Sequence, residues 1–317
     1  MKFTLFQETR TGARKSNQDR LGYTYSREAL LLIVADGMGG HLHGEVAAQI
    51  AVQYVTEAFQ REAQPKLADP FLFLLKSITS AHHAILDYAS AKDLQETPRT
   101  TCVACLVQDS VAYWAHVGDS RLYHLRQGRV QAVTKDHSRV QMLVDQGRIR
   151  EESVAAHPDR NKIYNCLGSE SAPQVDLSRK TVLEQGDTLL LCSDGLWGPL
   201  SAALISAALL NKGQPGSQLS QDELARAVSG LMDQAELRAG RECDNVSVVA
   251  MNWLDHYTGK GAAGEVSTQT LELGEFSSQV DPFGKAVAAN KAADLTDAEI
   301  ERAITEIRKA IRKQSPK

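Results

Sequence analysis

Short apolar runs alternate along the chain with longer stretches in which apolar residues recur about every fourth position. The runs Phe3–Arg10, Leu21–Tyr25 and Leu30–Ala35 have the length and composition of strands. Two longer stretches follow, from about Gly44 to Arg61 and from about Pro70 to Lys92. Their apolar residues lie at helical spacing, so each stretch predicts a helix that packs on one face.

A series of hairpins is predicted in the middle of the chain. Polar pairs such as Asp109-Ser110 and Gln127-Gly128 are short enough to join neighbouring antiparallel strands. The four strand-like runs of this region are Thr101–Gln108, Val111–Gly118, Arg121–Arg126 and Arg129–Thr134. Residues 137–172 are polar and broken, and they contain short helical pieces such as Val140–Gln146.

The pattern then returns to longer elements. Val175–Leu183, Thr188–Cys192 and Val246–Trp253 predict strands. Between the last two, a stretch from about Ser201 to Arg238 predicts helix, with a break near residues 213–216. Hairpins grouped beside helices are typical of the α+β class, in which helices cover antiparallel sheets.

The composition changes from residue 255 onward. Residues 255–294 are rich in Gly, Ala, Ser and Thr, which predicts a flexible linker after a single domain of residues 1–254. Residues 295–313 predict an amphipathic helix, because a capping box at Thr296 to Glu299 precedes an apolar stripe. The stripe consists of Ile300, Ile304, Ile307 and Ile311. It indicates a docking face for a protein partner or for this chain itself, although its basic end also fits a membrane surface or plain solvent.

Composition and charge exclude several classes of protein. The chain has 317 residues, of which 43% are hydrophobic and 23% charged, so a packed core is expected. A net charge of −4 gives no broad basic surface for nucleic acid. No apolar run approaches the length of a membrane span, and Met1 to Leu5 has the pattern of a strand, not of a signal peptide. A cytoplasmic protein is therefore expected.

The five cysteines are scattered, and only Cys102 and Cys105 form a C-x-x-C pattern. That pair lies in a strand-like run, where residues three apart point to opposite faces, so zinc or redox use is not expected. Small buried residues in a reducing compartment are the simpler interpretation.

Candidate chemistry comes from carboxylates at the ends of apolar runs. Asp36, Asp119 and Asp194 each follow such a run and lie beside a glycine, and Asp244 stands just before another run. Carboxylates gathered in one place repel unless protons or cations compensate them. Oxygen ligands without His or Cys suit hard cations such as Mg²⁺, Mn²⁺ or Ca²⁺. Any one of these residues taken alone is better explained as a turn residue, and only the set in this order favours a metal site.

An arginine completes the requirements of phosphate-ester hydrolysis. Two metals bridged by a carboxylate can make water nucleophilic, and a guanidinium matches a phosphate bidentately. Arg14, between the first two predicted strands, is the candidate for this second role. Gly37 to Gly40 also precedes a predicted helix, but it lacks the spacing and the lysine of nucleotide-binding loops.

Seven motifs in register closely resemble the metal-dependent protein phosphatase family (type 2C serine/threonine phosphatases) in its bacterial form, over about residues 3–254. They are Arg14-x-x-Asn17-Gln18-Asp19, Asp36-Gly37-Met38-Gly39-Gly40-His41 with Gly44-Glu45, Arg99-Thr100-Thr101, Gly118-Asp119-Ser120-Arg121, Thr134-x-Asp136-His137-Ser138, Ser193-Asp194-Gly195-Leu196 and Asp244-Asn245. The resemblance implies a four-layer α/β/β/α sandwich of two antiparallel sheets flanked by helices. It also identifies residues 137–172 as the flap that shapes substrate access.

The resemblance further implies a role for each candidate residue. Asp36 would bridge two Mn²⁺ or Mg²⁺ ions, with the Gly37 carbonyl completing one of them. Asp194 and Asp244 would ligate the other ion, and Asp19 would act on the pair through a bound water.

The remaining implied roles concern a third metal and the substrate. Asp119, with Asp194, would hold a third, weaker metal, and Arg14 would grip the substrate phosphate. The implied reaction is hydrolysis of phosphoserine and phosphothreonine by a water that bridges two metals, without a phosphoenzyme. The implied partners are phosphorylated proteins, the targets of a cognate Ser/Thr kinase.

The chain departs from many eukaryotic members at two positions. Gln18 replaces a Glu, and Met38 replaces a His that is proposed to protonate the leaving group, so the general acid is open between a metal-bound water, His41 and His43. His137 and Ser138 adjoin Asp136, but sequence neighbours rarely form a triad, and Asp136 is expected to have a structural role. For Arg121 we expect a structural salt bridge.

The alternative functions are an inactive relative that only captures phosphoproteins and a phosphohydrolase of small molecules. A pseudo-enzyme usually lacks one or more metal ligands, whereas all five aspartates are present here.

Overall fold

The computed structural model describes residues 1–38, 43–150, 153–154, 157–210 and 218–255. The predicted helix at 295–313 and all but the first residue of the predicted linker at 255–294 lie outside these ranges. No helix within them is both long enough and apolar enough to span a bilayer.

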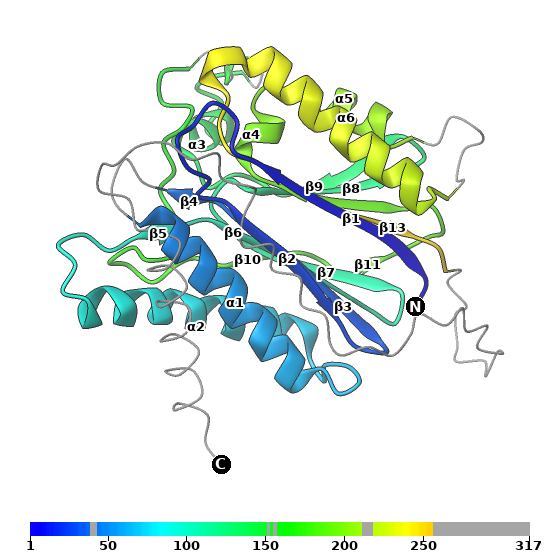
Figure 1. Cartoon of the computed structure of the whole chain (residues 1–317), viewed down its shortest axis with the longest axis horizontal. Coiled ribbons are helices and arrows are strands. Elements are labelled where there is room, and N and C mark those ends of the chain that lie inside the picture. The colour runs from blue at the N-terminus through cyan, green and yellow to red at the C-terminus, as the bar shows by residue number, and fades with distance from the viewer. Residues whose placement is uncertain (39–42, 151–152, 155–156, 211–217, 256–317) are drawn as a thin grey trace.

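Two antiparallel sheets lie face to face with helices on their outer sides, which gives four layers (Figure 1). The first sheet has the order β1 (Phe3–Arg10), β13 (Val246–Trp253), β12 (Thr188–Cys192), β8 (Arg121–Arg126) and β9 (Arg129–Val133). The second has the order β10 (Asp176–Leu177), β7 (Val111–Val117), β6 (Cys102–Gln108), β3 (Ala29–Ala35) and β2 (Arg20–Tyr25), and β11 (Thr181–Val182) also pairs with β7. The predicted α/β/β/α sandwich is confirmed.

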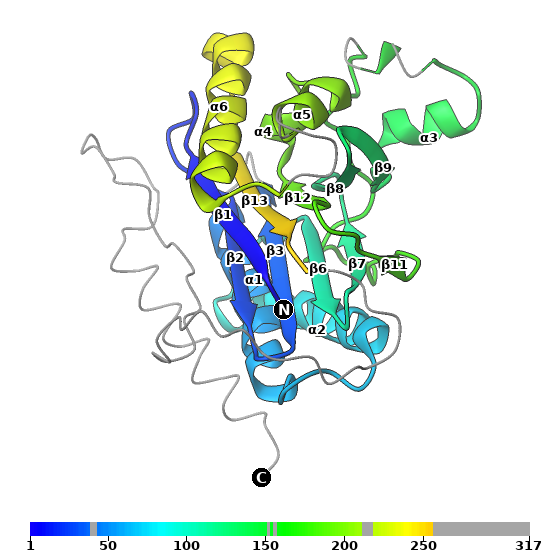
Figure 2. The same ribbon diagram turned by 90° about the vertical axis from the view of Figure 1, so that its right-hand side faces the viewer.

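Helices cover each sheet on its outer face. Figure 2 shows α1 (Gly44–Glu62) and α2 (Pro70–Ala91) against the second sheet, and α5 (Ala202–Ala208) and α6 (Gln221–Ala239) against the first. Their starts follow from local sequence. The Asp69 carboxylate accepts from the Leu72 amide at the start of α2, and Ser220 and Glu223 form a capping box at the start of α6.

The hydrophobic core has three parts, because each sheet has two buried faces. Strand β3 illustrates this, since all seven of its residues are buried. Leu31 and Ile33 pack towards α1 and α2, whereas Leu30, Leu32 and Val34 pack between the sheets. A strand that is buried on both faces lacks polar alternation, which is why it appears in the sequence as a continuous apolar run.

The cysteines behave as predicted. Cys102 packs on the helical side of β6 and Cys105 packs between the sheets, so the two thiols point to opposite faces. All five cysteines are buried and free, and burial raises the pKa of the Cys102 thiol to about 12. A thiol held protonated in this way is a poor nucleophile and a poor metal ligand.

The structure differs from the predicted strand Val175–Leu183. Strands β10 and β11 both pair with β7, where Leu177 lies opposite Ala115 and Thr181 lies opposite Ala112. Thr181 is four residues after Leu177, whereas Ala112 is only three residues before Ala115. The extra residue interrupts the ladder, as in a β-bulge.

Several short elements were not predicted from the sequence. β4 (Gly37–Met38) pairs with β5 (Arg99–Thr100), α4 (Asp194–Trp197) starts directly at a predicted site residue, and a 3₁₀ turn covers Gly240–Glu242. The flap contains α3 (Arg139–Asp145), where a helical piece was expected. Elements of two to four residues are too short to show a hydrophobic period.

Candidate metal centre

The predicted carboxylates come together at one end of the sandwich. Asp36 directly follows β3, and Asp119 follows β7 by two residues, both in the second sheet. Asp194 follows β12 by two residues and Asp244 precedes β13 by two, both in the first sheet. All four line a single cleft of about 1170 Å³, together with Arg14 and Gly37. Two facing sheets therefore bring residues more than 200 positions apart to one rim.

The pKa values of these aspartates show that the carboxylates share one electrostatic environment. Burial raises the pKa of Asp36 well above its usual range, and repulsion by Asp19 and Asp194 raises it further. Burial also raises the pKa of Asp194, with added repulsion from Asp119 and Asp244. The pKa of Asp119 rises to about 7 through burial and the nearby Asp136. Such a group of acids is costly unless a cation neutralises it.

Asp19 is not among the residues that line the cleft, and it is only 2% exposed. Its Oδ2 accepts a hydrogen bond of 2.7 Å from the Ser193 hydroxyl, whereas its buried Oδ1 has no hydrogen-bond partner within the described residues. Burial raises the pKa of Asp19 to about 6 despite the Ser193 hydrogen bond. A buried carboxylate oxygen without a partner, beside several other acids, fits a bound divalent cation or its water shell.

The main chain at Asp36 is fixed by the motif Arg99-Thr100-Thr101. The Asp36 carbonyl accepts from the Thr100 hydroxyl at 2.8 Å and from the Thr101 amide at 2.9 Å, and the Asp36 amide donates to Thr101 Oγ1 at 3.0 Å. The next residue, Gly37, admits no side chain. A Cβ there would lie 2.3 Å from the Gly44 carbonyl oxygen and 2.6 Å from that of Gln18. This close packing explains the glycine and sets the position of the rim.

Asn245 and Ser193 were named in the sequence only as motif neighbours of the acids, and the structure gives each a positioning role. Asn245 Nδ2 donates to the carbonyls of Thr11 and Ser16, and its Oδ1 accepts from the Gln18 amide. These bonds tie the segment that carries Arg14 and Asp19 to the start of β13. Ser193 Oγ accepts from the Ser247 amide at 3.0 Å while it donates to Asp19.

Arg14 lies at the mouth of the cleft with 56% of its side chain exposed. Its Nη2 donates to Asp244 Oδ2 at 2.6 Å, and this hydrogen bond raises the pKa of the guanidinium. The cation is therefore held against one of the predicted metal ligands. Within the described part of the chain, its other guanidinium donors make no hydrogen bond and can bind a phosphate.

Arg121 makes the structural salt bridge that was expected of it. Its Nε and Nη2 bind both oxygens of Asp136 at 2.8 and 2.7 Å, and its guanidinium carbon lies 3.6 Å from the centroid of the Trp197 ring. The Trp197 indole in turn donates to the Asp119 carbonyl at 2.9 Å. This network fixes the main chain at Asp119 through the bond from Trp197 to its carbonyl.

The structure does not assemble a nucleophilic triad at Asp136, His137 and Ser138. Arg121 occupies the carboxylate of Asp136, and the Ser138 hydroxyl accepts from the Gln141 amide as the cap of α3. Of the two histidines considered as general acids, His43 lines the cleft and His41 lies outside the described residues.

Comparison with known proteins identifies a family for this chain. The family model described as Protein phosphatase 2C matches residues 8–226. The serine/threonine phosphatase Stp of Listeria innocua is 34% identical over 209 residues, which are 65% of this chain and 82% of that protein.

Solved structures give the same result. The S. agalactiae serine/threonine phosphatase has a TM-score of 0.68 at 30% identity, with 80% of this chain and 100% of that chain covered. The catalytic domain of the phosphatase PstP, solved in complex with two manganese ions, has a TM-score of 0.64 at 32% identity, with 80% and 99% covered. The family match over more than half of the sequence, and relatives at 30% identity or more, show that the chain belongs to the protein phosphatase 2C family of bacterial serine/threonine phosphatases.

Proposed function

We propose that this phosphatase hydrolyses phosphoserine and phosphothreonine residues of proteins with the help of two divalent cations, Mn²⁺ or Mg²⁺. The observation that carries the proposal is the convergence of Asp36, Asp119, Asp194 and Asp244 on one cleft with Arg14 at its mouth. The solved manganese complex of the PstP catalytic domain supports the choice of metal. Oxygen ligands alone suit both cations.

The proposed ligand roles follow the placement of each residue. Asp36 and the Gly37 carbonyl would hold the first ion, with Asp36 shared between both, and Asp194 and Asp244 would hold the second. Asp19, whose buried Oδ1 has no hydrogen-bond partner among the described residues, would act on the pair through water. Asp119 and Asp194 would hold a third, weaker ion. When bound, the metals would lower the pKa of a bridging water and polarise the phosphoryl oxygens.

The chain's own cation would bind the substrate. Arg14 would donate to two phosphoryl oxygens and orient phosphorus for in-line attack, because a guanidinium matches a phosphate in a bidentate geometry. Its hydrogen bond to Asp244 holds it at the same rim as the acids. Because Arg14 would already hold the phosphate dianion in this orientation, less entropy would be lost on reaching the transition state.

The test compares the wild type with Asp36→Asn and with Asp109→Asn, whose carboxylate is exposed and pairs with Lys66. Metal is first removed from each protein. Turnover of p-nitrophenyl phosphate and of a phosphothreonine peptide is then measured before and after Mn²⁺ is added. We expect metal-dependent turnover of both substrates in the wild type and in Asp109→Asn. In Asp36→Asn it should fall by about a hundredfold or more.

Three results would contradict the proposal. Turnover that does not need a metal would remove the two-metal mechanism. Activity confined to small phosphate esters would make the protein a small-molecule phosphohydrolase. Phosphopeptide binding without any turnover by the wild type would indicate a phosphoprotein-binding regulator.

Partners and location belong to the same proposal. The substrates would be phosphoproteins made by a cognate Ser/Thr kinase, and residues 295–313 would recruit a protein partner. A cytoplasmic location is supported by five buried thiols without a disulfide, as in a reducing compartment.

A further inference from the structure

We propose that His137 is a positioning residue that fixes the main chain before Asp119 and fastens both arms of the flap to that point. The proposal rests on the proposed function in one respect, namely that Asp119 is a metal ligand. His137 is 4% exposed and lies directly after Asp136, where the chain enters the flap. Its contacts run in three directions.

The first direction is the rim of the cleft. The His137 amide donates to the Gly118 carbonyl at 2.9 Å, and the Gly118 amide donates back to His137 Nδ1 at 3.1 Å. Gly118 has φ +101°, and a Cβ there would lie 2.7 Å from Thr101 Cβ. The Gly118 main chain is therefore held between Thr101 on one side and His137 on the other. Because Asp119 is the next residue, the direction of its carboxylate depends on this contact.

The second direction is the returning arm of the flap. Asn165 Nδ2 donates to His137 Nδ1 at 2.7 Å, and the Tyr164 amide donates to the His137 carbonyl at 2.9 Å. Asn165 is itself oriented by Gln174, whose amide donates to its Oδ1 and whose carbonyl accepts from its Nδ2. Asn161 and Ile163, a few residues earlier, line the cleft. The same imidazole thus contacts both the rim and the flap segment that contributes Asn161 and Ile163 to the cleft.

The third group of contacts, with His116 and Asp176, has the composition of a metal site. The potential ligand atoms of His116, His137 and Asp176 lie within 4.8 Å of one another, and the two imidazoles stack at 4.7 Å between centroids. The hydrogen bonds argue against an ion here. A histidine that ligates a metal usually donates its other ring N–H to an acceptor. His137 Nδ1 instead accepts two N–H groups, so the ring hydrogen is on Nε2 and leaves no lone pair there.

Asp176 is a secondary contact of the imidazole. Its Oδ2 lies 3.2 Å from His137 Nε2, but the pair lacks the alignment of a hydrogen bond. Nε2 therefore has no hydrogen-bond partner within the described residues. His116 Nε2 donates to the Lys135 carbonyl at 2.8 Å and supports the ring from one face. The proposal therefore assigns the function of His137 to its Nδ1 acceptor.

Two substitutions distinguish the contribution of Nδ1 from that of Nε2. In His137→Asn the amide oxygen can take the place of Nδ1, and the contact to Asp176 is lost. In His137→Gln the amide reaches towards Asp176, and the acceptor for Gly118 and Asn165 is lost. We expect His137→Gln to raise the Mn²⁺ concentration for half-maximal turnover by about tenfold or more, and to raise the KM for a phosphopeptide. His137→Asn should stay within about threefold of the wild type.

Hydrogen exchange of the metal-free protein provides a readout that does not need activity. The amides of Gly118 and Tyr164 should exchange faster in His137→Gln than in the wild type, and His137→Asn should restore their protection. Asp176→Asn should leave these amides and the Mn²⁺ requirement unchanged. If the wild type proved inactive, the proposed function would fail, while the exchange pattern would still decide the role of His137.

The control is His124→Gln, the same substitution at a buried histidine of β8 that pairs with Asp187. It should lower thermal stability without a change in Mn²⁺ requirement. Equal effects of His137→Asn and His137→Gln would overturn the proposal. So would an equal shift of the Mn²⁺ requirement in His124→Gln, because His137 would then contribute only to general stability.

Discussion

Arg14 illustrates how a single residue links substrate binding to the metal ligands. Its guanidinium bonds to Asp244 at 2.6 Å and yet remains more than half exposed. In water such an exposed pair adds little to stability. Its value lies in orientation, because the bond holds one edge of the planar fork and turns the rest towards the cleft.

Arg14→Lys should therefore weaken catalysis more than it weakens the fold. Lysine keeps the charge but cannot bind Asp244 and two phosphoryl oxygens in one plane. We expect kcat/KM for a phosphothreonine peptide to fall by about tenfold, mainly through KM, with a melting temperature close to that of the wild type. Steady-state kinetics and thermal unfolding measure the two effects. Arg61→Lys, at an exposed pair with Glu62, is the control and should change neither.

At the scale of elements, the sequence predicts the helices and strands that have a hydrophobic period. It does not predict contacts that depend on a segment far away in the chain. The β3 run and the helical spacing of α1 predict those elements to within one residue, because burial of a whole face leaves a regular mark. The aspartates follow from their motifs at strand ends. No sequence pattern predicts the hydrogen bonds that Thr100 and Thr101 make to Asp36, or the one that Trp197 donates to Asp119. They depend on which segments the two sheets bring together.

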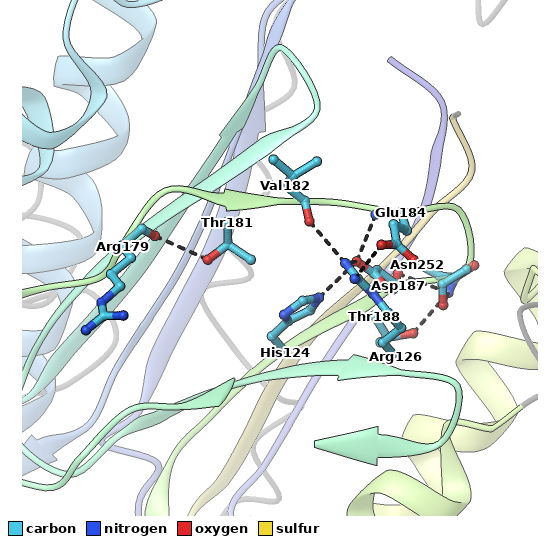
Figure 3. Close-up of polar contacts among 10 residues, drawn as sticks. His124, Arg126, Arg179, Thr181, Val182, Glu184, Asp187, Thr188 and Asn252 are labelled. Atoms are coloured by element: carbon cyan, nitrogen blue, oxygen red, sulfur yellow. Dashed lines mark hydrogen bonds and ion pairs between the residues drawn. The ribbon is translucent and has the colours of Figure 1, made fainter. Parts of the chain in front are cut away.

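The connection that leads into β12 contains a buried ionic network at the end of the strand away from Asp194 (Figure 3). Asp187 is fully buried, and both its oxygens accept from Arg126 at 2.7 Å. Its Oδ2 also contacts His124 Nε2 at 2.9 Å and accepts from the Glu184 amide. Burial alone would raise the pKa of Asp187, but the bonds from Arg126 and His124 outweigh it and hold the pKa below the ordinary value.

Asp187→Asn should destabilise the protein by about 3–5 kcal/mol, because it leaves the Arg126 charge without its main partner. The pKa of Asp187 is depressed in the folded state, so its contribution is complete above the ordinary carboxylate pKa. It is lost as the pH falls through the folded value. Urea unfolding at neutral pH should show the full difference, and unfolding below about pH 4 a smaller one. A difference that did not change with pH would contradict the ionic account.

Asp109→Asn is the matched control for this charge removal. Asp109 pairs with Lys66 on the surface, where both side chains are more than 40% exposed, so the cost should be below about 1 kcal/mol. Asp109 has φ +54°, a conformation that asparagine also tolerates, so backbone strain does not enter the comparison.

For the whole molecule, the cluster of acids makes stability, pH and metal depend on one another. The folded-state pKa rises to about 6 for Asp19 and to about 7 for Asp119, and it rises for Asp36 and Asp194 as well. In the unfolded chain these groups ionise near pH 4. Between these values the folded state binds more protons than the unfolded state, so the metal-free protein should lose stability as the pH rises.

A divalent cation should reverse this trend, because it binds the ionised carboxylates of the folded state and displaces their protons. We expect the melting temperature in a chelator to fall from pH 5 to pH 8, and the increase caused by Mn²⁺ to be larger at pH 8 than at pH 5. Calorimetry at the two pH values measures both quantities. In Asp36→Asn, with one fewer charge to compensate, the fall should be shallower and the Mn²⁺ effect smaller. An equal Mn²⁺ effect at both pH values would mean that the ion binds away from these acids, and the link between the cleft and catalysis would fail with it.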